Sequence, residues 1–296
     1  MERPNLGFAV SYLDPERLQE QLTEWSSAGF GAIETDYPPL LENPIRVLES
    51  WSSVIRDAGI TVWSVHAPYG GAYNLSHPDK RQRRRAVEIH KVVLERSHIL
   101  GAQVLVIHPS ADSSHKSSAP SLLNESLEEL LPLAQDLKIV LAVENMLPDS
   151  WGENPAELSR LIAGFLSPWI RLCFDTGHAH IAGNATLWLE TVLESVATYH
   201  LADNEGTHDL HLQPGYGTVP WHQLAPLLQE ASFPLIIEAI PWGKRPLKRV
   251  REEVEALLTG RVATTAIAGT QGYIKCRSCG SLLIEAEPGA FSCSCL

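Results

Sequence analysis

Nine imidazole and carboxylate side chains of this 296-residue chain lie at the ends of short apolar runs, or in the loops just beyond them. Three of these runs read WSVHAPY at residues 63–69, VLVIHPS at 104–110 and VLAVENM at 140–146. Imidazole nitrogens and carboxylate oxygens are ligands for divalent metal ions, and nine of them suit a cluster of two or three ions better than one ion. The candidate metal ligands are His66, His108, Glu144, Asp175, His178, His200, Asp209, His211 and Glu238.

The apolar runs also predict the elements that must position these side chains. Runs rich in Val, Ile and Leu are typical of buried parallel strands. Here they alternate eight times with helical segments, up to a last predicted helix at residues 247–258. Eight such units favour a closed (β/α)8 TIM barrel over an open sheet, and the carboxyl ends of barrel strands meet at one face. No G-x-G-x-x-G follows the first run, which counts against a dinucleotide-binding fold. The strands are expected at residues 6–13, 30–36, 60–66, 102–109, 138–145, 170–176, 197–203 and 234–240.

Composition and charge limit the classes of partner. The formal net charge of −12 argues against binding nucleic acid by bulk electrostatics. One basic run at residues 80–85 begins a predicted helix, and it is either a solvated helix face or a phosphate-contacting edge near the site. No apolar run is long enough to span a membrane, and the first ten residues lack the features of a signal peptide. We therefore expect a cytoplasmic protein without a membrane partner.

The composition changes after Gly260. We expect a barrel over residues 1–260, a linker over 261–272 and a small tail over 273–296. The tail holds four of the five cysteines, and a C-x-x-C-G turn can present two thiolates to one zinc ion. The prediction is an irregular zinc ribbon with a structural zinc ion, and the alternative is a redox-labile tail. Cys173, outside the tail, is predicted to be a small buried hydrophobe. The candidate zinc ligands are Cys276, Cys279, Cys293 and Cys295.

Six motifs resemble those of the xylose isomerase-like TIM barrels, a superfamily that holds sugar phosphate isomerases and epimerases as well as the endonuclease IV family of abasic-site nucleases. The resemblance covers about residues 5 to 260 and is specific for the superfamily rather than for one reaction. The motifs are HAPY at 66–69, VIHP at 106–109, ENM at 144–146, FDTGHAHIAG at 174–183, HLADN at 200–204 and D-x-H-L-x-x-G-x-G at 209–217.

The two branches imply different chemistry for the same residues. In the isomerase branch one Mn²⁺ or Mg²⁺ would be held by Glu144, Asp175, His200 and Glu238. Glu144 and Glu238 would then be the catalytic residues that exchange a proton beside a metal-polarised carbonyl. In the endonuclease IV branch all nine ligands match a trinuclear zinc site with Glu144 bridging. Tyr69 would there match a DNA-contacting tyrosine, and metal-activated water would cleave a phosphodiester.

The acidic charge and the short predicted loops favour the isomerase branch. Tyr216 stands between two glycines where both branches often carry Glu, so this position departs from both patterns. The favoured prediction is a metal-dependent sugar or sugar phosphate isomerase or epimerase, with one to three Zn, Mn or Mg ions in the barrel and a small-molecule sugar as partner. The first alternative is an endonuclease IV-like nuclease, with DNA as the partner only in that case. The second is a non-catalytic, zinc-dependent binding module.

Overall fold

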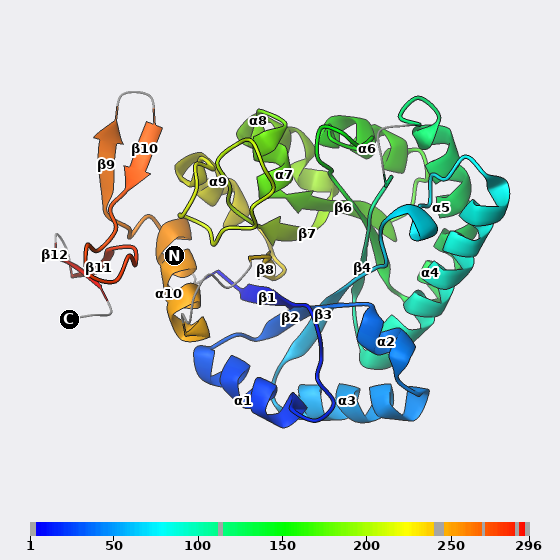
Figure 1. The fold of residues 1–296 in the computed structure, drawn as a ribbon, viewed down its shortest axis with the longest axis horizontal. Coiled ribbons are helices and arrows are strands. Elements are labelled where there is room, and N and C mark those ends of the chain that lie inside the picture. Colours follow the sequence, from blue (N-terminus) through cyan, green and yellow to red (C-terminus); the bar gives the residue numbers. More distant parts are fainter. Residues whose placement is uncertain (1–3, 112–114, 240–245, 268–269, 288–289, 294–296) are drawn as a thin grey trace.

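Eight parallel strands form a closed barrel in the computed structural model, which describes residues 4–111, 115–239, 246–267, 270–287 and 290–293. Neighbouring strands pair in sequence order, and the first pairs with the eighth to close the ring (Figure 1). This confirms the predicted TIM barrel. Seven of the eight barrel strands fall within their predicted ranges, and β7 begins one residue before its predicted range. The strands are β1 (Leu6–Val10), β2 (Ala32–Asp36), β3 (Thr61–His66), β4 (Val104–Ile107), β5 (Val140–Glu144), β6 (Ile170–Asp175), β7 (Val196–Leu201) and β8 (Leu235–Ile237).

Helices cover the outside of the barrel (Figure 1). Local signals set several of their ends. Asp79 accepts a hydrogen bond from the backbone N–H of Gln82 at the start of the longest helix, and Gly101 ends that helix with a left-handed φ of 94°. The helices are α1 (Leu18–Ala28), α2 (Pro38–Glu42), α3 (Ile45–Asp57), α4 (Lys80–Leu100), α5 (Ala119–Leu137), α6 (Pro155–Ala163), α7 (Thr176–Ile181), α8 (Ala185–Val192), α9 (Trp221–Leu228) and α10 (Leu247–Leu258), with 3-10 turns at Gly71–Tyr73 and Leu193–Ser195.

Two short helices, α2 and α7, were not predicted from the apolar pattern, because helices of five and six residues show too little periodicity. Helix α7 follows β6 directly, and Asp175 starts it by accepting a hydrogen bond from the N–H of His178. The main core lies between the strands and the surrounding helices. Cys173 is fully buried in a small separate cluster with Val104 and Val106, as predicted. No described helix is long and apolar enough to cross a membrane.

The chain beyond the barrel lies beside α10 (Figure 1). Strands β9 (Thr264–Ile267) and β10 (Thr270–Tyr273) form an antiparallel pair, and β11 (Ile284–Glu287) pairs with β12 (Ala290–Ser292). The stretch 261–272 was expected to be a linker, but it contains β9 and most of β10. Its threonines and isoleucine favour extended backbone, and pairing between the two halves satisfies the backbone groups.

Candidate metal centre

The barrel places the nine predicted ligands at the carboxyl ends of its strands. His66, Glu144 and Asp175 are the last residues of β3, β5 and β6, and His200 is the last residue but one of β7. His108 and Glu238 directly follow β4 and β8. The other three lie farther along: His178 is in α7, and Asp209 and His211 are in the loop between β7 and α9. Parallel strands that end at one face of a barrel bring all of these side chains to one site.

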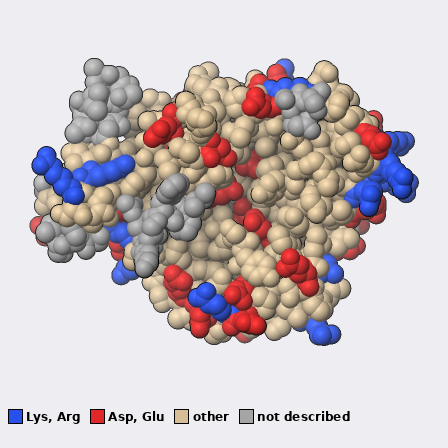
Figure 2. All heavy atoms as spheres, in the orientation of Figure 1, with Lys and Arg blue, Asp and Glu red and all other residues tan. Residues whose placement is uncertain are grey.

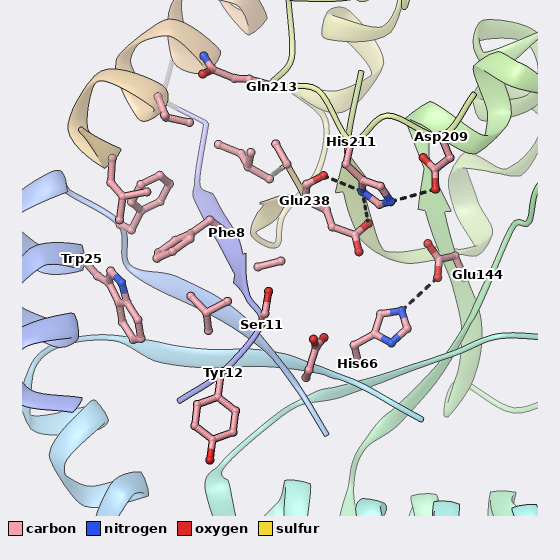
Figure 3. A pocket seen from close by; sticks show the side chains of 18 of the residues that line it. Phe8, Ser11, Tyr12, Trp25, His66, Glu144, Asp209, His211, Gln213 and Glu238 are labelled. Carbon is pink, nitrogen blue, oxygen red and sulfur yellow. Dashed lines mark hydrogen bonds and ion pairs between the residues drawn. The ribbon is translucent and has the colours of Figure 1, made fainter. Parts of the chain in front are cut away.

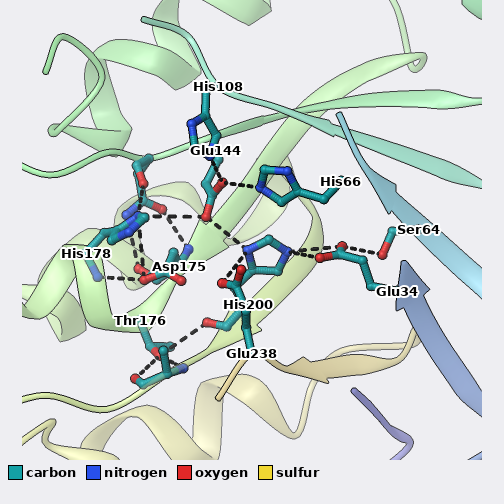
Figure 4. Close-up of polar contacts among 12 residues, drawn as sticks. Glu34, Ser64, His66, His108, Glu144, Asp175, Thr176, His178, His200 and Glu238 are labelled. Carbon is teal, nitrogen blue, oxygen red and sulfur yellow. Dashed lines mark hydrogen bonds and ion pairs between the residues drawn. The ribbon is translucent and has the colours of Figure 1, made fainter. Parts of the chain in front are cut away.

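The nine side chains form three groups whose donor atoms lie within 4.8 Å of one another in each group. Glu144 belongs to two of them, so its carboxylate lies between the first and the second group (Figure 4). We call the groups first, second and third. The first group is His66, His108 and Glu144; the second is Glu144, Asp175, His200 and Glu238; the third is His178, Asp209 and His211.

The two oxygens of Glu144 face different groups. Its Oε2 lies 3.0 Å from Nε2 of His108 and 3.5 Å from Nε2 of His66, while its Oε1 lies 2.9 Å from Nδ1 of His200. The same His200 nitrogen lies 3.1 Å from Oε2 of Glu238. This division of one carboxylate between two donor groups is the geometry that a bridging ligand needs.

The third group is more open than the other two. Asp209 Oδ2 lies 2.9 Å from Nε2 of His211 and 3.4 Å from Nε2 of His178. His211 has a left-handed φ of 43°, which is uncommon for a residue with a side chain. Strained backbone of this kind clusters at functional sites, where the surrounding structure holds it.

Unsatisfied buried oxygens indicate that cations fit this site. Oδ2 of Asp175 and Oδ1 of Asp209 are buried, and neither has a hydrogen-bond partner among the described residues. A buried carboxylate oxygen without a donor is costly, and a bound cation removes that cost. Mixed imidazole and carboxylate donors suit Zn²⁺ and Mn²⁺.

Contacts on the far side of two histidine rings set which nitrogen faces each group. Nδ1 of His66 lies 3.0 Å from the carbonyl of Ala67, and Nδ1 of His178 lies 2.8 Å from the carbonyl of Asn145. Each Nδ1–H therefore donates to a carbonyl, which leaves Nε2 as the acceptor nitrogen in the donor group. Such outer contacts orient metal-binding histidines in proteins.

Glu34 makes the corresponding contact to His200, and the sequence did not identify it as a site residue. Its side chain in β2 is buried, accepts a hydrogen bond of 2.6 Å from the Ser64 hydroxyl and lies 3.1 Å from Nε2 of His200 (Figure 4). The available signal was a Glu inside an apolar strand two residues before its end. Asp36, the last residue of β2, lines the cavity beside the donor groups, and the sequence did not identify it either.

Burial and pairing shift the pKa values of these groups in opposite directions. Burial raises the pKa of Asp175 to about 7, and burial likewise raises that of Asp36 to about 6. Burial opposes the charged form of His66, but the hydrogen bond and charge of Glu144 outweigh it and raise its pKa to about 9. The pKa of Glu238 falls to about 2, because the charge of His200 overcomes the effect of burial. Opposed shifts within one site are typical of functional centres.

The donor groups form one wall of a cavity of about 770 Å³. Apolar side chains, including Phe8 and Trp25, line the opposite part of the cavity (Figure 3). Tyr69 also lines the cavity, is 57% exposed, and has its ring centre 5.0 Å from that of His108. Its exposed ring can contact a ligand that enters the cavity.

The charges around the cavity are mostly acidic on this face. Figure 2 shows Asp and Glu side chains in the hollow at the centre of the view and basic side chains at its periphery. In the basic run, Arg83 is buried and pairs with Glu125 and with the carbonyl of His77. Lys80, Arg81, Arg84 and Arg85 remain exposed on α4. The run thus consists of one buried, paired arginine and four exposed basic side chains on α4.

The cysteines of the tail also come together. Sulfur atoms of Cys276, Cys279 and Cys293 lie within 4.8 Å of one another. Cys295 lies outside the described residues. The arrangement is compatible with the predicted zinc ribbon.

The chain matches known proteins over most of its length. It is 28% identical to an uncharacterized protein of Methanocaldococcus jannaschii over 249 residues, which are 79% of this chain and 83% of that protein. It is 29% identical to a probable endonuclease 4 of Pediococcus pentosaceus over 230 residues, which are 69% of this chain and 76% of that protein. The structure of an L-ribulose 3-epimerase has the same fold, with a TM-score of 0.75 at 17% identity, and the match covers 88% of this chain and 95% of that one. Residues 22–259 match the xylose isomerase-like TIM barrel family, and the chain belongs to it.

Proposed function

We propose that this protein is a metal-dependent hydrolase of sugar phosphodiesters, with three divalent ions held by the nine ligands of the donor groups. The observation that carries the proposal is the presence of three donor groups in one site, of which the first and the second share Glu144. Relatives named probable endonuclease 4, 25–29% identical to the chain, support it. The sequence alone favoured the isomerase branch, and the division of the ligands into three groups changes that preference.

The number of donor groups separates the two reactions. Proton transfer beside a carbonyl needs one ion, and the second group alone can hold it. That reaction leaves the first group's histidines and the whole third group without a role. Two or three ions suit phosphodiester hydrolysis, because when bound they lower the pKa of water and neutralise the charge that develops on the attacking and leaving oxygens.

The protein's own residues would hold and present the substrate. Glu144 would bridge the first and second groups with its two oxygens. Tyr69, at the edge of the cavity beside His66 and His108, would contact the sugar or the neighbouring base. The cavity has room for a nucleotide-sized group, and its apolar wall suits a sugar that has lost its base. A flipped-out abasic nucleotide of DNA is therefore the substrate class that we infer.

Sugar epimerisation is the second candidate, and the completeness of the second group favours it. Oxygens of Glu144 and Glu238 both lie within 3.1 Å of Nδ1 of His200, so two carboxylates face one position. In that case Glu144 and Glu238 would exchange the proton beside the carbonyl of a ketose, and the acidic surroundings would present no obstacle to a small sugar.

Variants of the third group distinguish the two reactions. Metal-reconstituted protein is tested for nicking of a duplex with one abasic-site analogue, and for deuterium exchange into ketoses and their phosphates. A hydrolase loses nicking in both His178→Ala and Glu238→Gln. An epimerase keeps deuterium exchange in His178→Ala and loses it in Glu238→Gln. His208→Ala is the matched control, because His208 is an exposed histidine in the same loop as Asp209.

Each outcome has a definite meaning. Nicking by the wild type that persists in His178→Ala contradicts the three-ion hydrolase. If a protein that carries its full set of ions shows neither nicking nor deuterium exchange, both enzymatic functions are contradicted. That result would favour a zinc-dependent binding module.

A further inference from the structure

The loop that carries Asp209 and His211 packs against the cysteine-containing tail. We call residues 203–219 the ligand loop and residues 273–296 the tail. Leu282 of the tail is fully buried and contacts the ligand loop at Gly215. Gly215 has a φ of 91°, and a Cβ atom there would lie 2.9 Å from a methyl carbon of Leu282 and 3.5 Å from Leu257. The glycine therefore provides the space in which the leucine side chain sits.

A buried carboxylate joins the ligand loop to α10. Glu253 is fully buried, and its Oε2 accepts hydrogen bonds of 2.7 Å from Nε2 of Gln213 and 2.9 Å from the hydroxyl of Tyr216. Its Oε1 accepts a hydrogen bond of 2.9 Å from Nε of Arg249. Charged hydrogen bonds away from water are strong, so Glu253 fixes both residues of the ligand loop.

The tail is held by the same residues. The backbone N–H of Leu282 donates to the Tyr216 hydroxyl at 3.2 Å, and Nη2 of Arg249 donates to the Leu282 carbonyl at 3.0 Å. The ammonium group of Lys275 lies 4.5 Å from the centre of the Tyr216 ring. Tyr216 thus contacts the tail and Glu253 at once, which gives a role to the tyrosine that stands between the two glycines.

The tail segment that holds Leu282 is shaped by the turn between the first two cysteines. The N–H of Cys276 donates to the Ser281 carbonyl at 2.7 Å, and the N–H of Gly280 donates to the Cys276 carbonyl at 2.8 Å. On the ligand-loop side, Gln213 is two residues from His211. The path from a tail cysteine to a ligand of the third group is therefore a short run of direct contacts.

We propose that the tail positions the ligand loop. The affinity of the third group for a metal ion would then depend on the contacts that Leu282 makes with Gly215 and Tyr216. This inference rests on the proposed three-ion centre. Without the tail contact, the loop that carries Asp209 and His211 would lose the contacts that Leu282 makes with Gly215 and Tyr216. The first and second groups lie on or next to barrel strands and do not need this support.

The test measures ion content in the full-length protein. Leu282→Ala opens the contact with Gly215, and Tyr216→Phe removes the hydroxyl but keeps the ring. Phe291→Ala is the matched control, because Phe291 is an exposed apolar residue of the same tail. Each protein is loaded with Co²⁺ and dialysed against increasing concentrations of a chelator, and the bound ions are then counted. The absorption band of thiolate-bound Co²⁺ measures the ion held by the cysteines separately from the barrel ions.

We expect Leu282→Ala and Tyr216→Phe to weaken the binding of one barrel ion by about 10- to 100-fold, the range for loss of an outer contact to a metal site. Phe291→Ala should match the wild type, and Leu282→Met should restore most of the lost affinity. The double variant Leu282→Ala/His178→Ala should bind no fewer ions than His178→Ala alone, because both changes act on the third group.

Two results would overturn the inference. In the first, folded Leu282→Ala and Tyr216→Phe bind their barrel ions with the same affinity as the wild type. This would show that the tail does not position the ligand loop. In the second, the wild-type barrel binds only one ion, which would contradict the three-ion centre on which the inference rests. The number of ions bound by the wild type therefore distinguishes the two failures.

Discussion

Glu34 and His200 lie side by side in the barrel, with 3.1 Å between Oε2 of the glutamate and Nε2 of the histidine. Both side chains are almost fully buried. The other ring nitrogen of His200 faces Glu144 and Glu238, so Nε2–H donates to Glu34 and Nδ1 is left for a metal ion. A carboxylate behind a ligand histidine fixes the ring and makes it a stronger ligand.

Replacing Glu34 should weaken metal binding without unfolding the barrel. We expect Glu34→Gln to lower the affinity of the second group by about tenfold, because the neutral amide fills the same space but lacks the charge that supports His200. Competition with a chromophoric chelator measures the change. Glu49→Gln, on the exposed face of α3, should have the wild-type affinity. An unchanged affinity in Glu34→Gln would show that the contact does not support the metal site.

The tail should hold one zinc ion of its own. We expect Cys276→Ser to bind about one zinc ion fewer per chain than the wild type, because the remaining sulfurs cannot complete a tetrahedral site. Metal content after dialysis, measured by mass spectrometry, checks this count. Ser278→Ala, in the same turn, removes no thiol and should keep the ion. Equal zinc content in Cys276→Ser and the wild type would contradict the zinc ribbon.

A buried histidine outside the donor groups should make stability depend on pH. His90 on α4 is buried, and burial lowers its pKa to about 4. The folded state thus binds fewer protons than the unfolded state, in which the pKa is about 6.5, so stability falls as the pH drops from about 6.5 to 4. His90→Gln cannot take up this proton. We expect it to lose about 3 kcal/mol less free energy of unfolding than the wild type over that range.

Denaturant unfolding of the two metal-free proteins at several pH values isolates the contribution of His90, since all other titrating groups are shared. Curves that stay parallel from pH 7 to pH 4 would mean that His90 takes up its proton in the folded state at no cost.

The folded conformation of the ligand loop should depend on the Asp203 carboxylate. Its buried carboxylate accepts hydrogen bonds from the backbone N–H groups of Gly215 and Val219, and from the indole of Trp221 at 2.8 Å. Asp203→Asn replaces one acceptor oxygen with a donor, so at least one buried N–H loses its partner. We expect a loss of about 2–4 kcal/mol in the free energy of unfolding.

Thermal unfolding, compared with that of Asp149→Asn on the protein surface, measures the effect of the Asp203 substitution. The third donor group should lose its ion in the same variant. A melting temperature equal to that of the surface variant would show that the carboxylate is not what holds the loop.

The apolar runs of the sequence are sufficient to predict the barrel and to name the side chains that could meet in it. Burial of a parallel strand leaves a local trace, an apolar run of about five residues, and the polar residue that ends the run must point to the common face of the barrel. Six candidate ligands could be named for this reason, because they lie at the end of such a run or directly after it. His178, Asp209 and His211 were named because they lie in the segments just beyond the runs, and all nine side chains lie together at the site.

The division of these residues into groups, and the contacts that support them, depend on the tertiary structure. Strand register and barrel closure determine which donor atoms face one another. They bring together Glu34 and His200, which are separated by 166 positions in the sequence. The fold also determines that Glu144 is shared between two groups and that Leu282 packs against Gly215. A local pattern reports how buried a residue is, but the identity of its partner is a property of the closed fold.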